Sequence, residues 1–300
     1  MVAALITAFL FSISAIFGEK SARIYGAAKA NLGRLLVAFV FLALWSFTYG
    51  QGFQGAGFAW LILSGFIGFG LGDLALFAAF TRIGPRLTVL ITQCLAGPVA
   101  GLAEWLWLGQ TIPFSHLAAS LIILLGIFLA LLPGRNRPPA HSQYRLGVIF
   151  GVLSALGQGL GAVVTRKSIL VNELEGFTID GGTAAFQRML GGLVVALVFY
   201  CLLPAVRDLN KLAPQKKSWR EKGWLIVLLN GLAGPCLGVA FYQSALSNTP
   251  SAIVLAIVAT SPVILLIFQI VTRREKPGLL SILGSLLAVA GAILLAWIQN

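Results

Sequence analysis

The sequence predicts an all-α integral membrane protein of ten transmembrane helices, arranged as two inverted five-helix repeats. The first observation is composition, because 58% of the 300 residues are hydrophobic and only 10% are charged. The second is that apolar stretches of about 20 residues, long enough to cross a bilayer as helices, recur along the chain. The third is a similarity between the two halves. Five spans in each half place the second copy upside down relative to the first.

The apolar segments are expected to be helices because they are continuously apolar, whereas the strands of a membrane barrel alternate over about ten residues. The first segment has no basic residue before its apolar run, and Glu19 and Lys20 follow where a small-residue cleavage site would be expected. We therefore interpret it as a retained span and not as a signal peptide. The predicted spans are 2–18, 30–48, 57–80, 85–108, 114–132, 146–165, 183–203, 223–246, 250–271 and 278–298.

The positions of the basic residues predict a topology and argue against nucleic-acid binding, although the net charge is +12. If the connections alternate between the two sides of the membrane, one side carries all of the 21 basic residues except Arg34, Arg166, Lys167 and Arg188. Basic loops stay in the cytoplasm, so we expect cytoplasmic basic loops and both termini outside. The predicted organisation is a first repeat over 1–133, a cytoplasmic linker over 134–145 and a second repeat over 146–300.

The internal repeat can be followed residue by residue. Matching segments occur in the same order and at similar spacing, so each half is expected to be one structural repeat with the functional cavity at their interface. The matched segments are Gly18–Ser21 with Thr165–Ser168, Ala30–Leu36 with Ala184–Leu190, Arg82–Pro85 with Ser247–Pro250, and Ala96–Val99 with Thr260–Val263.

This pattern resembles the drug/metabolite transporter superfamily, in particular its EamA-type ten-helix members, over essentially the whole chain. The shared features are an Arg in the second helix of each half (Arg34 and Arg188), a small-residue third helix, a Pro-started fourth helix with an internal Pro-Val, and a Gly-rich fifth helix. The resemblance implies secondary transport or export of small metabolites, often amino acids, through a central cavity without a bound cofactor. It also implies a bacterial inner membrane as the location.

Two features depart from the family pattern. Family members usually carry Glu before the Pro-Val of the fourth helices, where this chain has Gly97 and Ser261. The common family topology also places the termini in the cytoplasm, whereas the basic residues here place them outside.

Four charged residues are predicted at membrane depth, where a charge is costly and usually faces a cavity or a partner. They are Arg34, Asp73, Glu104 and Arg188, and their formal charges sum to zero. We expect two pairs, Asp73 with Arg34 and Glu104 with Arg188, one on each side of the cavity. The pairs could bind substrate or serve only as fixed links between helices. If Glu104 titrates as a proton-coupling site, Glu104→Gln should abolish transport driven by a pH gradient and leave counterflow intact.

Uncharged polar groups form a second set of candidates, because an amide deep in a span needs a partner that another helix or a substrate supplies. The candidates for substrate binding are Gln93, Gln158, Gln187, Tyr242 and Gln243. Pro98, Pro235 and Pro262 are expected to interrupt spans, either as hinges that open and close the cavity or as static kinks. The run Gly65, Gly68, Gly70 and Gly72 favours close helix packing over phosphate binding.

No catalytic constellation and no metal-ligand spacing occur in the sequence, so we expect neither an enzyme nor a metal site nor a cofactor.

The expected function is secondary transport of small metabolites by alternating access, with amino acids as the first class, in the direction of export. The balanced acid and base suit a zwitterion. The alternatives are a lipid-carrier flippase or channel-like conduit, and a structural membrane protein without transport. The expected partners are a small-molecule substrate and membrane lipids. A monomer suffices because both repeats are in one chain, and a dimer is the alternative.

Overall fold

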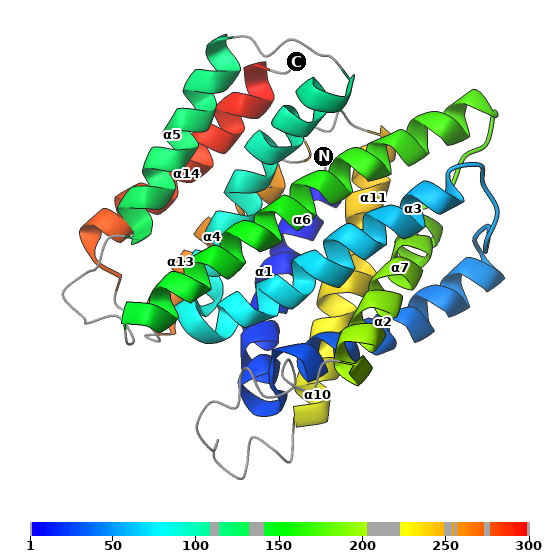
Figure 1. The fold of residues 1–300 in the computed structure, drawn as a ribbon, viewed down its shortest axis with the longest axis horizontal. Coiled ribbons are helices and arrows are strands. Elements are labelled where there is room, and N and C mark those ends of the chain that lie inside the picture. Colours follow the sequence, from blue (N-terminus) through cyan, green and yellow to red (C-terminus); the bar gives the residue numbers. More distant parts are fainter. Residues whose placement is uncertain are drawn as a thin grey trace.

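The computed structural model describes residues 2–108, 114–131, 141–202, 223–248, 254, 257–272 and 277–298. Every regular element in these ranges is a helix (Figure 1). The first half contains α1 (Val2–Tyr25), α2 (Ala27–Thr48), α3 (Phe58–Gly65), the π-helix η1 (Phe66–Gly72), α4 (Asp73–Leu108) and α5 (Phe114–Leu131). The second half contains α6 (His141–Leu174), α7 (Gly181–Leu202), α10 (Gly223–Gly231), the π-helix η2 (Leu232–Gly238), α11 (Val239–Asn248), α13 (Ser261–Val271) and α14 (Leu279–Ile298).

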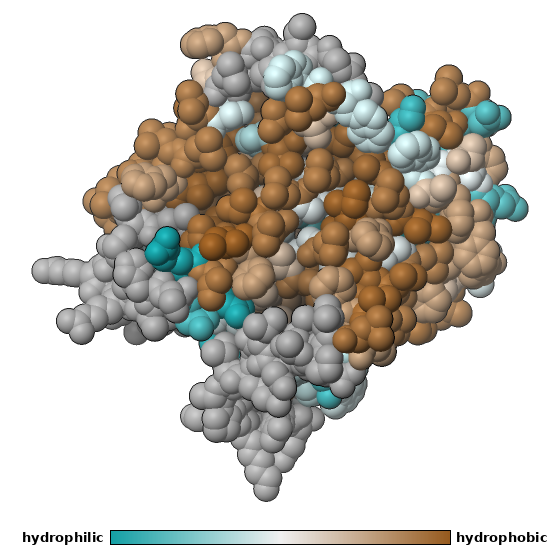
Figure 2. Space-filling view, viewed as in Figure 1, coloured by the Kyte–Doolittle hydropathy of each residue, from teal (hydrophilic) through white to brown (hydrophobic). Residues whose placement is uncertain are grey.

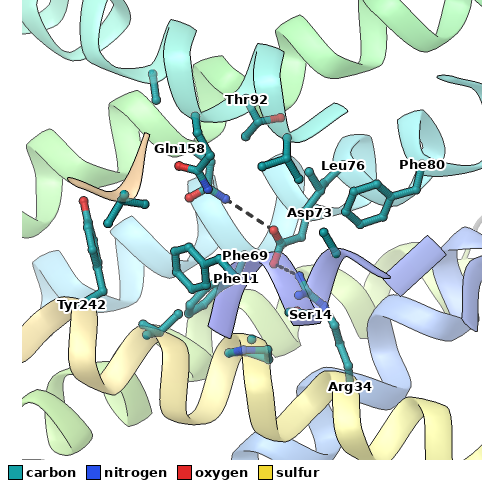
Figure 3. Close-up of a pocket in the computed structure, with 18 of the residues that line it drawn as sticks. Phe11, Ser14, Arg34, Phe69, Asp73, Leu76, Phe80, Thr92, Gln158 and Tyr242 are labelled. Carbon is teal, nitrogen blue, oxygen red and sulfur yellow. Dashed lines mark hydrogen bonds and ion pairs between the residues drawn. The ribbon is translucent and has the colours of Figure 1, made fainter. Parts of the chain in front are cut away.

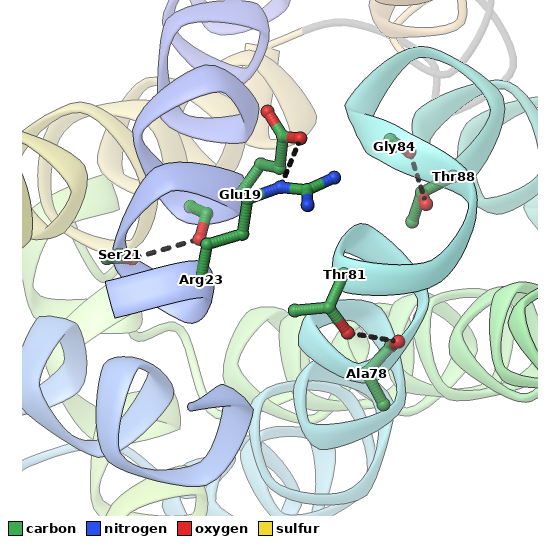
Figure 4. Close-up of polar contacts among 8 residues, drawn as sticks. Glu19, Ser21, Arg23, Ala78, Thr81, Gly84 and Thr88 are labelled. Carbon is green, nitrogen blue, oxygen red and sulfur yellow. Dashed lines mark hydrogen bonds and ion pairs between the residues drawn. The ribbon is translucent and has the colours of Figure 1, made fainter. Parts of the chain in front are cut away.

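The run from α3 to α4 contains two spans separated by a bend at Gly84. Gly84 has φ 76° and ψ 168°, a conformation that glycine adopts readily and other residues rarely do. Pro85 follows and cannot donate a backbone hydrogen bond across the bend. The hydroxyl of Thr88 donates to the carbonyl of Gly84 at 2.7 Å, and that of Thr81 donates to Ala78 at 3.0 Å (Figure 4). The bend lies between the predicted spans 57–80 and 85–108.

Glycines bring helices of the two halves into close contact. A Cβ atom on Gly65 of α3 would overlap the carbonyl oxygen of Arg188 in α7. A Cβ on Gly231 of α10 would lie 2.8 Å from the carbonyl oxygen of Arg34 in α2. In both places the chain continues from the glycine directly into a seven-residue π-helix. The arginines therefore lie where one half packs against the other, and the close packing predicted for the glycine run is found at Gly65.

The outer surface is apolar, as expected for a membrane protein. In the described ranges, six helices are long and apolar enough to cross a bilayer, and shorter apolar helices lie at 118–130, 261–271 and 279–295. Figure 2 shows hydrophobic side chains over most of the visible face. Leu121, Leu125 and Phe128 of α5 are among the exposed apolar residues, and α5 packs along α14 (Figure 1). Such a large exposed apolar surface suits lipid and not water.

Pro262 lies in the first turn of α13, which begins at Ser261, and its missing N–H costs no hydrogen bond there. The chain makes a turn at Ala259 and Thr260 directly before α13, so the helix is broken next to this proline, within the predicted span 250–271. Arg86, which the charge pattern assigned to a basic loop, is 5% exposed and donates to the hydroxyls of Ser285 at 3.3 Å and Ser281 at 3.1 Å. Pro98 and Pro235 do lie inside helices.

Candidate functional site

A cavity of about 80 Å³ lies among helices of both halves. A water molecule needs roughly 10–15 Å³ of such space, so the cavity has room for several. Figure 3 shows the side chains that converge on it. The polar lining residues are Ser14, Arg34, Asp73, Thr92, Gln93, Gln158, Arg188 and Tyr242, and the aromatic lining also includes Phe11, Phe69 and Phe80.

Arg34 and Asp73 form a buried ion pair, as the sequence predicted. Nη2 of Arg34 donates to Oδ2 of Asp73, and Nε of Arg34 donates to Oδ1 of Asn31 at 3.1 Å. The guanidinium also lies over the ring of Phe77, with its central carbon 4.6 Å from the ring centroid. Gln158 donates to Oδ1 of Asp73 at 3.4 Å. Both carboxylate oxygens of Asp73 are therefore engaged by groups of the protein.

Arg188 lines the same cavity but has a different environment. It is 3% exposed, and its guanidinium lies over the ring of Phe69 at 4.8 Å. Its Nε is buried, and within the described part of the chain no acceptor lies within hydrogen-bonding distance of it. The expected pair between Arg188 and Glu104 is wrong. Oε1 of Glu104 instead accepts from Nη1 of Arg166 at 2.7 Å, and Arg166 is half-exposed.

The pairing of Glu104 with Arg166 follows from the length of α6. Arg166 lies near the end of the long helix α6, which packs along α4, and α4 carries Glu104. The sequence interpretation placed Arg166 in a loop, because the predicted span ended at 165. The extension of α6 to Leu174 brings the Arg166 side chain to Glu104.

Two predicted glutamines lie outside the cavity lining. Gln187 donates from Nε2 to the carbonyls of Gly52 and Gln54, both at 2.9 Å, and so holds the connection between α2 and α3. Gln243 is buried beside a second, smaller group of polar residues that includes Asn172 and Thr165. Gln93, Gln158 and Tyr242 do line the cavity.

A polar network joins α2 to the start of α7 beside the α2–α3 connection. Oδ1 of Asp180 accepts from the indole of Trp45 at 2.8 Å and from the backbone N–H groups of Gly182 at 2.8 Å and Thr183 at 3.1 Å. The Thr183 hydroxyl donates to the other oxygen of Asp180, and the backbone N–H of Gln51 donates to that hydroxyl at 3.1 Å. Asp180 thereby caps α7 and ties it to α2.

The same network determines the acidity of Asp180, which precedes the α7 span. Partial burial raises the pKa of its carboxyl, but the hydrogen bonds from Thr183, Trp45 and Gly182 stabilise the ionised form. The net result is a pKa below the usual value for aspartate.

Several lining residues were not recognisable from sequence. Ser14 donates to Oδ1 of Asn230 at 2.7 Å, so α1 contributes a polar group. The small hydroxyl residues of this mostly apolar segment did not stand out in the sequence. Phe11 and Phe69 are ordinary residues of apolar spans, and nothing in their spacing marks them. The π-helical turns had a weak signal in the glycines that flank them, at 65 and 72 and at 231 and 238. In the described ranges no three His, Cys, Asp or Glu side chains come together as metal ligands would.

A charged cavity inside a bundle of apolar helices defines a membrane transport protein of the helical class. The chain belongs to the EamA-like transporter family, whose model matches residues 1–132 and 145–297. It is therefore an integral membrane protein of a transporter family and not an enzyme.

Two further similarities were found. A WAT1-related protein of Arabidopsis thaliana is 27% identical over 139 residues, which are 43% of this chain and 38% of that protein. The match thus spans less than two fifths of the relative. A solved crystal structure has a TM-score of 0.64 at 18% identity, and the alignment covers 98% of this chain and 94% of the other. That likeness shows the shared fold alone.

Proposed function

We propose that the chain is a secondary transporter that moves small amphipathic metabolites, with amino acids and related solutes as the first class, by alternating access. The observation that carries this proposal is the cavity, which buries Arg34, Asp73 and Arg188 among aromatic side chains contributed by both halves. A transporter uses such buried charges to bind a polar solute at the depth of the membrane.

The proposed architecture is ten helices in two inverted five-helix repeats, over 1–133 and 146–300, joined by a linker over 134–145. It is supported by the correspondence between Arg34 in α2 and Arg188 in α7, and between the two π-helical turns. An inverted pair of repeats provides two equivalent ways to open the same cavity, one toward each side of the membrane. Both repeats lie in one chain, so a monomer suffices.

Pro98 and Pro235 are the proposed hinges. Pro235 lies in η2 and lines the cavity, and Pro98 lies in α4 between Ala96, another lining residue, and the outer end of that helix. Each proline removes one backbone hydrogen bond, so bending at these points costs less than elsewhere in the helix.

We place the basic loops in the cytoplasm and the termini outside, on the charge asymmetry of the connections. The proposed location is a bacterial inner membrane and the proposed direction is export. The proposed location and direction rest on the family resemblance.

A lipid-carrier flippase is a second candidate, because an apolar pocket of about 410 Å³ lies beside the cavity. Ile67, Leu71, Leu74, Phe150 and Leu153 contribute to its lining, which suits an acyl chain.

Counterflow in proteoliposomes tests the proposal. Purified protein is reconstituted without an ion gradient, and radiolabelled neutral amino acids, organic anions, organic cations and sugar phosphates are tested side by side. The proposal predicts saturable exchange of one class that unlabelled solute of the same class inhibits. Exchange of none of them by protein shown to be folded contradicts it, and scrambling of a fluorescent lipid by the same vesicles would support the flippase.

A further inference from the structure

We propose that Arg188 binds a carboxylate of the transported solute. At Arg34, its counterpart in the first half, the carboxylate of Asp73 occupies the equivalent position. The inference rests on the proposed transport function and specifies which solutes the cavity accepts. It follows from a comparison of the two arginines, which occupy matching positions and have different partners.

The repeat aligns Arg34 with Arg188 within the matched segments Ala30–Leu36 and Ala184–Leu190. Arg34 uses two partners, and both are replaced in the second half. Asn31, which accepts from Nε of Arg34, aligns with Ala185. Asp73 is the residue that directly follows η1, and the residue that directly follows η2 is Val239. The second half therefore keeps the arginine and lacks both groups that would satisfy it.

Arg188 is a buried arginine whose hydrogen-bonding groups are not all satisfied by the described residues. Its Nε is buried without an acceptor in the described part of the chain, and its guanidinium lines the cavity. The ring of Phe69 covers one face of the guanidinium, and Gly68 lies against Nη2, where a Cβ would approach to 3.2 Å. An arginine stays charged in a protein, and a buried charge without a partner is strongly unfavourable. An anion that enters the cavity removes this penalty.

The charge of the cavity selects the same kind of ligand. Arg34, Asp73 and Arg188 carry a formal charge of +1 together, so a solute with one negative charge neutralises the site. Asp73 also attracts Arg188 electrostatically, but it forms no hydrogen bond with Arg188 in the described structure. A guanidinium binds a carboxylate through two parallel hydrogen bonds, which a single remote charge does not provide.

Asp73 is not available for a cationic group of the solute. Its two oxygens accept from Arg34 and Gln158. The charge of this carboxylate is thus already neutralised by Arg34, so an amino group on the solute would compete with Arg34 for it and contribute little to affinity. With Phe11, Phe69 and Phe80 in the lining, the favoured solute is a monocarboxylate with an apolar or aromatic body, whether or not it carries an amine.

Thermal unfolding of the purified full-length protein in detergent, titrated with sodium benzoate or with benzamide, tests this proposal. The two probes have nearly the same shape and differ in charge. A ligand that binds the folded state raises the midpoint of unfolding, and the shift grows with the ratio of its free concentration to its Kd. We expect benzoate to raise the midpoint and benzamide not to do so at the same concentration. Equal shifts with both probes, or no shift with benzoate, would overturn the proposal.

Variants at two positions make the test specific. Arg188→Gln should raise the apparent Kd for benzoate by about tenfold or more, the loss expected for a hydrogen bond to a charged group, and Arg188→Lys should keep part of the affinity. Val239→Asp recreates in the second half the acid that follows η1 in the first. It should fill the site of Arg188 and suppress benzoate binding without removing the arginine. Val239→Asn, of similar size and uncharged, should bind benzoate nearly as the unmodified protein does.

The results separate this proposal from the proposed function. Unchanged benzoate binding in folded Arg188→Gln or folded Val239→Asp would show that Arg188 is only a packing residue held by Phe69. Transport itself would still be established if counterflow of any solute class is observed. Benzoate binding through Arg188 together with no counterflow would contradict transport and leave the anion site in place.

Discussion

Arg34 and Asp73 form an ion pair in which the side chains are 6% and 3% exposed, and the pair lies at the cavity between the two halves. The pair joins α2 to the start of α4, and Gln158 of α6 extends it. Removal of either partner would leave a buried charge uncompensated, which is more costly than the loss of the pair as a unit.

Asp73→Leu should therefore destabilise the protein by about 3–5 kcal/mol, whereas Arg34→Leu together with Asp73→Leu should cost much less. Unfolding in detergent, followed by circular dichroism, measures both. Glu19→Gln is the matched control, because Glu19 pairs with the partly exposed Arg23 within α1 and should contribute less than about 1 kcal/mol. A double variant no more stable than Asp73→Leu would show that the charges are not coupled.

Glu104→Gln should change stability by less than about 1 kcal/mol, because its partner Arg166 is half-exposed and water compensates the loss. Neither Glu104 nor Arg166 lines the cavity. We therefore expect counterflow and transport driven by a pH gradient both to survive in this variant. Selective loss of the pH-driven transport would instead return Glu104 to the role of a coupling site.

Gly65→Ala should separate α3 from α7 and destabilise the protein by several kcal/mol, since its Cβ would overlap the backbone of Arg188. It should also displace Arg188 and weaken solute binding. The control is Gly97→Ala in α4, where the new Cβ meets only a methyl group of Leu295 at 3.3 Å. Similar unfolding midpoints for the two variants would contradict the close approach of α3 and α7.

Asp180 should make the junction of α2 and α7 sensitive to acid. Its folded-state pKa is lowered below the unfolded value of about 3.9, so its contribution is fully present above that pH and is lost as the pH falls through the folded pKa. Asp180→Ala should cost about 0.5–2 kcal/mol at neutral pH, the usual range for loss of a helix cap. Asp180→Asn keeps a capping group that does not titrate.

The measurement is the unfolding midpoint from pH 7 downward. The difference between the unmodified protein and Asp180→Ala should shrink below about pH 4, while Asp180→Asn should lack this acid-dependent loss. A difference that is constant across the whole range would show that Asp180 does not act through its charge.

The sequence predicted the order of the described helices, because long apolar runs and their breaks are local properties. It did not predict all of their limits, since α1 and α6 run to Tyr25 and Leu174 where the predicted spans ended at 18 and 165. It also predicted the pair of Arg34 with Asp73, which followed from placing each charge at a depth along its helix. It paired Arg188 with Glu104 wrongly, because depth alone does not determine which way a side chain points around the helix axis. The continuation of α6 past the membrane-length segment, which brings Arg166 to Glu104, is similarly invisible in a hydropathy pattern.

Only part of the cavity lining could be predicted from the sequence. Arg34, Asp73 and Arg188 were found because charges are rare in apolar spans. Phe11 and Ser14 were not, since an apolar span contains many aromatic and small residues and only packing decides which of them face inward. Pro262 was expected inside a continuous segment, and the structure places it in the first turn of α13, just after a turn at Ala259 and Thr260.

If this cavity opens alternately to the two sides of the membrane, a single cysteine in its lining should be accessible to a water-soluble reagent from both sides. Thr92 is suitable, because it lines the cavity and its hydroxyl has no partner among the described residues. Thr92→Cys would be made in a protein whose Cys94, Cys201 and Cys236 are replaced by Ala or Ser, and labelled with a membrane-impermeant maleimide in right-side-out and in inverted vesicles. Alternating access predicts labelling in both kinds of vesicle, and a transported solute should slow the labelling in each. Labelling from one side only, or from neither in folded protein, would contradict it.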